Sequence, residues 1–98
     1  MSAIGYGSVS HGTVAVGTAS IAVMAANPDR KYALLQNDGT VDIYIKLGTA
    51  AAVLNTGVRV LANGGTYEMT RGAASVWNGA VQGISTIAAM RMLVTEGA

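Results

Sequence analysis

The feature that most constrains the fold of this chain is a set of short segments in which apolar and polar side chains alternate with a period of two. In 41–47, Val, Ile, Ile and Leu occupy the odd positions, and Asp, Tyr and Lys occupy the even ones. This period is that of a half-buried β-strand. The same alternation recurs in 58–60, 66–70 and 88–95. No segment keeps a helical period for more than two turns, so the sequence predicts an all-β protein.

Other segments add strands without a strict alternation. The segment 31–36 is apolar on both faces in its middle, which indicates a central strand covered on both sides. Two runs rich in Val, Ile, Ala and Thr, 13–16 and 18–24, are separated by Gly17 and fit a β-hairpin or two consecutive strands. Short segments at 76–77 and 81–84 flank Asn78-Gly79, whereas 48–57 is interpreted as a loop.

Turn residues divide these segments. Asn37-Asp38-Gly39 and Asn63-Gly64-Gly65 each stand between two strand-like runs and predict hairpins. Pro28, the sole proline, predicts a turn at an edge of the sheet. About eight short strands at intervals of roughly 8–12 residues favour an antiparallel β-sandwich or barrel, jelly-roll-like in its connections.

The chain has 98 residues, which is the length of one domain, and it shows no internal repeat. Residues 1–12 are rich in Gly and Ser, whose backbone entropy is costly to restrict without neighbours. We therefore expect a flexible N-terminal arm over 1–12 and a single β-sandwich domain over 13–98.

Apolar residues make up 51% of the chain and charged residues only 11%, against about 25% charged in ordinary soluble domains. Such a surface favours burial against other protein, so we expect a homo-oligomer, with a trimer as one option. No apolar stretch approaches the roughly 18 to 20 residues of a membrane span. The net charge of +1 lacks the clustered basic residues that bind nucleic acid. The N-terminus does not resemble a secretion signal, which indicates synthesis and retention in a cytoplasm.

Catalytic chemistry has few candidate groups, because the chain contains one His, five carboxylates and no Cys. His11 lies in the Gly/Ser-rich arm, where a solvated imidazole is favoured over a metal ligand. Asp29, Asp38 and Asp42 are close enough in sequence to suggest a calcium site, although turn chemistry and an outward strand position account for them. We expect no enzyme activity, no metal and no cofactor.

The remaining singled-out residues suit an interface. Trp77 and the tyrosines suggest a sugar-binding platform, but a lone Trp in a small sandwich is more typical of core or interface. Arginines at 30, 59, 71 and 91 are candidates to pair with carboxylates across an interface, or are singly exposed. The interface candidates are Tyr6, His11, Arg59, Arg71, Trp77 and Arg91.

Several sequence runs between Ala25 and Gly97 carry a resemblance. They are Asn-Pro-Asp-Arg at 27–30, Gln-Asn-Asp-Gly at 36–39, Tyr-Ile-Lys-Leu-Gly at 44–48, Gly-Gly-Thr-Tyr-Glu-Met-Thr at 64–70 and Val-Thr-Glu-Gly at 94–97. Together they resemble a family of small phage-encoded virion proteins. These are strand and turn patterns, and the resemblance implies capsid decoration or another accessory position in the head or tail.

We therefore expect a non-enzymatic virion protein, a capsid decoration (cement) protein. It would be synthesised in the host cytoplasm, and would bind the major capsid protein of the assembled phage head and stabilise that shell. The alternative is a recognition module of a tail fibre or spike that binds a host glycan or protein through aromatic side chains.

Overall fold

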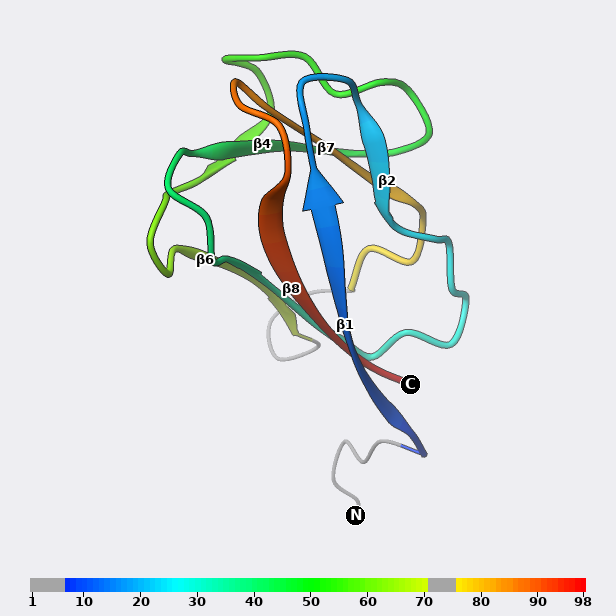
Figure 1. The fold of residues 1–98 in the computed structure, drawn as a ribbon. Helices are drawn as coiled ribbons and strands as arrows, with labels where there is room; N and C mark the ends of the chain where they lie inside the picture. Colours follow the sequence, from blue (N-terminus) through cyan, green and yellow to red (C-terminus); the bar gives the residue numbers. More distant parts are fainter. Residues whose placement is uncertain (1–6, 71–75) are drawn as a thin grey trace.

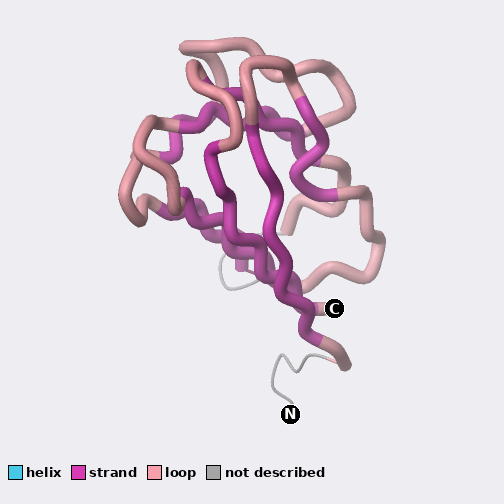
Figure 2. Tube along the Cα trace, in the orientation of Figure 1, coloured by secondary structure: helices cyan, strands magenta, loops and turns pink. Residues whose placement is uncertain are grey.

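The computed structural model describes residues 7–70 and 76–98, which contain strands and no helix (Figures 1 and 2). The strands are β1 (Val9–Val16), β2 (Ile21–Met24), β3 (Tyr32–Asn37), β4 (Ile43–Leu47), β5 (Val58–Val60), β6 (Thr66–Thr70), β7 (Val81–Ser85) and β8 (Met90–Gly97).

These strands form two four-stranded sheets in the orders β1-β8-β3-β6 and β2-β7-β4-β5, with every pair antiparallel. Among the described strands, only β4 and β5 are neighbours both in sequence and within a sheet; every other connection passes from one sheet to the other. This is the strand order of a jelly roll. The predicted all-β, jelly-roll-like sandwich of about eight strands is confirmed.

The core lies between the two sheets and follows from the alternation in the sequence. Ile43 and Ile45 of β4 are fully buried, while Tyr44 between them is half-buried on the other face. Across the core lie Leu35 of β3 and Met92 of β8, also fully buried. Since β3 is paired on one side with β8 and on the other with β6, its predicted central position is confirmed.

The two predicted hairpins are wrong. Asn37-Asp38-Gly39 connects β3 to β4, and Asn63-Gly64-Gly65 connects β5 to β6, and in both cases the strands belong to different sheets. Asn37 instead fixes a crossover between the sheets, because its buried amide donates to the carbonyls of Val41 (2.8 Å) and Val60 (3.0 Å). A turn signature shows that the chain reverses, but the partner of the next strand is decided by which apolar face it must bury.

Ser85 has a corresponding role between β7 and β8. Its buried hydroxyl lies within hydrogen-bonding distance of the carbonyl oxygens of Val16, Gly17 and Ile87. Its backbone N–H also donates to Gly17 O at 2.9 Å. These contacts hold the β7–β8 turn against the β1–β2 turn.

The N-terminal strand begins inside the segment expected to be an arm. Val9 pairs with Gly97, and the register continues without a shift to Val16 and Met90. Just before it, Ser8 and Ala98 exchange two backbone hydrogen bonds of 3.0 and 2.9 Å. The described part of 1–12 therefore contributes a strand to the sandwich, whereas residues 1–6 lie outside the described residues.

Candidate interaction surfaces

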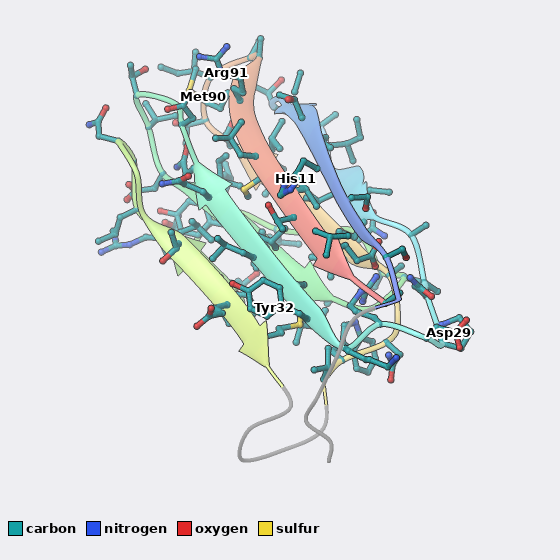
Figure 3. The ribbon with its side chains drawn as sticks, turned by 90° about the horizontal axis from the view of Figure 1, so that it is seen from below. His11, Asp29, Tyr32, Met90 and Arg91 are labelled. Atoms are coloured by element: carbon teal, nitrogen blue, oxygen red, sulfur yellow. The ribbon has the colours of Figure 1, made fainter. Side chains whose placement is uncertain are left out.

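His11 and Arg91 both lie on the outer face of the β1-β8-β3-β6 sheet (Figure 3). His11 Nδ1 lies 3.0 Å from Thr95 Oγ1 on the adjacent strand. Arg91 pairs with Asp38, with 2.9 Å between Nη2 and Oδ2, and its side chain is 61% exposed. These two interface candidates share a sheet face, but each interacts with a different neighbouring side chain.

The other interface candidates lie elsewhere. Arg59 belongs to β5 in the opposite sheet, and its Nε lies 3.5 Å from Asp42 Oδ2. Trp77 lies in the β6–β7 connection, where its exposed indole donates to Ala80 O at 3.0 Å and covers Gly79. Tyr6 and Arg71 lie outside the described residues. The described candidates therefore do not form one patch.

The burial of Arg30 was not predicted from the sequence. Its side chain is fully buried, and its Nε donates to Glu96 Oε2 at 2.6 Å. Its two terminal nitrogens donate to three backbone carbonyls, those of Trp77 (2.7 Å), Gly79 (3.0 Å) and Ala25 (2.6 Å). Arg30 thus joins the β2–β3 connection, the β6–β7 connection and the end of β8. The carboxylate partners of Arg30, Arg59 and Arg91 all belong to the same chain.

A shallow hollow of about 290 Å³ lies on the outer face of the β1-β8-β3-β6 sheet. The register places His11, Thr95 and Leu34 in one row across three strands, with Thr13, Leu93 and Gln36 in the next row. Leu34 and Leu93 give the hollow an apolar floor, and hydroxyl, imidazole and amide groups surround it. Such a mixture of groups suits a small polar ligand or a peptide.

One end of the sandwich exposes apolar side chains and carries no charge. This uncharged end consists of the connections 17–20, 48–57 and 86–89, which lie together at the top of Figure 1. Ala52 N–H donates to Ser20 Oγ at 2.8 Å, and Gly17 lies against Ala88, so the first connection contacts both of the others. Val53 is 54% exposed and Ile87 is 50% exposed.

The acidic side chains considered for calcium do not converge. Asp38 pairs with Arg91, and Asp42 accepts a hydrogen bond from Ala62 N–H at 2.9 Å. Asp29 is exposed, and its N–H donates to Asn27 Oδ1 in a local turn (Figure 3). Within 7–70 and 76–98, no group of three or more His, Cys, Asp or Glu side chains is placed to hold a metal ion.

Across the described part of the chain, no helix has the length and apolar character needed to span a membrane. Comparisons with protein-family models, with curated proteins and with solved structures find no match to this chain.

Proposed function

We propose that this chain is a non-enzymatic structural protein of a bacteriophage particle, a capsid decoration protein that binds the assembled head through its uncharged end. The observation that carries the proposal is the exposure of Val53 and Ile87 on adjoining connections without a charged residue. Contiguous exposed apolar surface is typical of protein–protein contact sites. The sequence resemblance to small phage virion proteins supports the choice of a capsid as the partner.

The architecture is compatible with this function but does not decide it. Jelly rolls occur in viral capsid proteins and also in lectin domains. Function depends on the site and not on the fold. The uncharged end is therefore the part of the molecule on which the proposal depends.

The mechanism is multivalent burial of small apolar contacts. Each apolar side chain that leaves water contributes roughly 25 cal/mol per Å² of buried area. A homo-oligomer that contacts several copies of the major capsid protein adds these weak contacts at high effective concentration. Because the bound protein favours the assembled state by mass action, the decorated shell should resist heat better than the bare shell.

The test is co-sedimentation with undecorated capsids of the phage that encodes this chain. We expect saturable binding at a stoichiometry related to the symmetry of the shell, together with an increased melting temperature of that shell. Ile87→Asp and Val53→Asp should each weaken binding at least about tenfold, because burial of a carboxylate costs several kcal/mol. Leu61→Asp is the matched control, since Leu61 is 53% exposed but lies outside the uncharged end.

Equal binding by all three variants would contradict the use of this end. The alternative, a recognition module of a tail fibre or spike, is favoured by the hollow over Leu34 and Leu93 and by the exposed indole of Trp77. Specific retention on a glycan array or on host cells, with no binding to capsids, would replace the decoration proposal with that alternative.

A further inference from the structure

The free edge of β1 has hydrogen-bonding groups that are directed away from the sandwich. β1 is the outermost strand of its sheet and pairs only with β8 among the described strands. Ser8 and Ala98 exchange both backbone hydrogen bonds. In an antiparallel ladder such pairs alternate with non-bonded pairs. Hence the backbone groups that bond to β8 are those of Ser10, Gly12 and Val14. The N–H and C=O groups of the alternate residues are directed to the free edge; these residues are Val9, His11, Thr13 and Ala15.

The other edges of the described sandwich are protected from pairing, and β1 is not. β2 has only four residues and a register shift between Ala22 and Met24. β5 has three residues and includes Arg59, and β6 carries Glu68. β1 has eight residues in unbroken register, with no charged residue and no proline. Short length, bulges and charges are the usual devices that keep an edge strand from pairing with another chain.

We infer that β1 pairs antiparallel with β1 of a second copy of this chain, across a two-fold axis at His11. An uncharged edge presents no repulsion to an identical edge. A two-fold antiparallel pair is also self-complementary, because each outward N–H meets an outward C=O. The pairing forms one continuous sheet with the order β6-β3-β8-β1-β1-β8-β3-β6.

The position of the axis follows from exposure and from the direction of the backbone groups. The five residues from Val9 to Thr13 are all exposed, and His11 is their centre, whereas Val16 is buried beside β2. The lower end of β1 in Figure 1 extends past β2. An axis at His11 sets His11 opposite its own copy and Val9 opposite Thr13 of the second copy, so that outward groups meet outward groups.

This inference specifies the self-association within the proposed function, but it does not require a capsid. Pairing brings the two copies of the hollow over Leu34 and Leu93 onto the same face, one on each side of the axis. The test therefore uses free full-length protein and is independent of the capsid assay.

The first experiment is cysteine cross-linking, for which the cysteine-free chain provides a clean background. At the axis, Cα atoms of opposite residues are about 5.5 Å apart, which a disulfide can span. His11→Cys should therefore form a covalent dimer under mild oxidation. Thr13→Cys is the matched control, because its two copies are offset along the strands by four residues, about 13 Å at roughly 3.3 Å per residue. Equal cross-linking at both positions, or none at position 11, overturns the inference.

The second experiment removes one outward donor and leaves the fold intact. Thr13→Pro deletes an N–H directed to the free edge, which β8 does not use, so the melting temperature should stay near that of the wild type. Dimerisation measured by light scattering should weaken at least about tenfold, because one hydrogen bond per copy is lost. Thr13→Val keeps the N–H and should dimerise like the wild type. Identical association of the two variants, a wild-type monomer at high concentration or a trimer overturns the inference, while capsid binding remains a separate result.

Discussion

Arg30 combines full burial with a formal charge, and its contacts explain how a chain with few charges tolerates it. Each of its three side-chain nitrogens donates to a carboxylate or a carbonyl. Because the Glu96 side chain remains 22% exposed, the ion pair is not isolated from water. Arg30 therefore acts as a connector of three segments distant in sequence, a role in which a planar guanidinium with several donors is better suited than an ammonium.

We predict that Arg30→Met lowers the free energy of unfolding by about 3–5 kcal/mol, because it leaves Glu96 and three carbonyls without their donor. Arg91→Met should change it by about 1 kcal/mol or less, since the exposed Arg91–Asp38 pair is screened by solvent. Chemical denaturation of both variants measures the difference. Similar losses for the two would show that the buried contacts of Arg30 contribute no more than a surface pair.

From the sequence, Arg30 was only one of four arginines expected either to pair with carboxylates across an interface or to be singly exposed. The sequence could not separate this residue from Arg59 or Arg91, because all three side chains are the same and the carboxylates lie far away in sequence. Burial depends on which connections meet at the lower end of the sandwich, and that is a property of the tertiary fold. The turn Asn27-Pro28-Asp29 before Arg30 was the local signal that this position is fixed.

At the scale of single elements, alternation located most strands because it reflects a local requirement. The segment 41–47 alternates, and β4 buries Ile43 and Ile45 as expected. The interpretation of 48–57 as a loop is also confirmed. The strand pairing predicted from the two turns was wrong, because in this topology nearly all hydrogen-bonded partners are distant in sequence. The edge of β1 was missed for the same reason: its Gly and Ser content indicates flexibility unless the pairing with β8 is known.

Gly83 of β7 lies where side chains of β2 in the same sheet and of β1 in the facing sheet pack closely against the β7 backbone. A Cβ atom at this buried position would lie 2.7 Å from Val23 Cγ2 and 3.6 Å from Val16 Cγ1. We predict that Gly83→Ala lowers the free energy of unfolding by about 1–3 kcal/mol through overpacking. Gly12→Ala in β1 is the matched control, because no atom lies within 4 Å of its Cβ position, and its stability should be unchanged or slightly higher.

Thermal denaturation of the two glycine variants distinguishes these outcomes. The double variant, Gly83→Ala with Val23→Ala, should lose less stability than the sum of the losses of the two single variants. The reason is that Val23→Ala removes the methyl group that the new Cβ would contact. Residues in direct contact are expected to show such non-additivity. Strict additivity, or an equal loss at Gly12, would contradict the packing explanation.

At the scale of the whole molecule, the charged residues lie outside the three connections that expose Val53 and Ile87. Three of the arginines are paired with carboxylates of the same chain, at Glu96, Asp42 and Asp38. The uncharged end holds no Asp, Glu, Lys or Arg in its three connections. The proposed contact with a partner through this end would therefore depend on apolar burial far more than on ion pairs.

This separation predicts how capsid binding responds to salt. Sodium chloride screens exposed charges, with a Debye length of about 10 Å at 0.1 M and about 3 Å at 1 M, but it does not screen apolar burial. The dissociation constant measured by co-sedimentation should therefore change less than about threefold from 0.1 to 1 M sodium chloride. Ammonium sulfate should tighten binding, because excluded salts strengthen apolar burial.

Val53→Lys is the informative variant, since it places one charge on the uncharged end and should make binding weaker and dependent on salt. A wild-type affinity that falls tenfold or more over the same range of sodium chloride would show that ion pairs, and not the uncharged end, hold the protein on the shell.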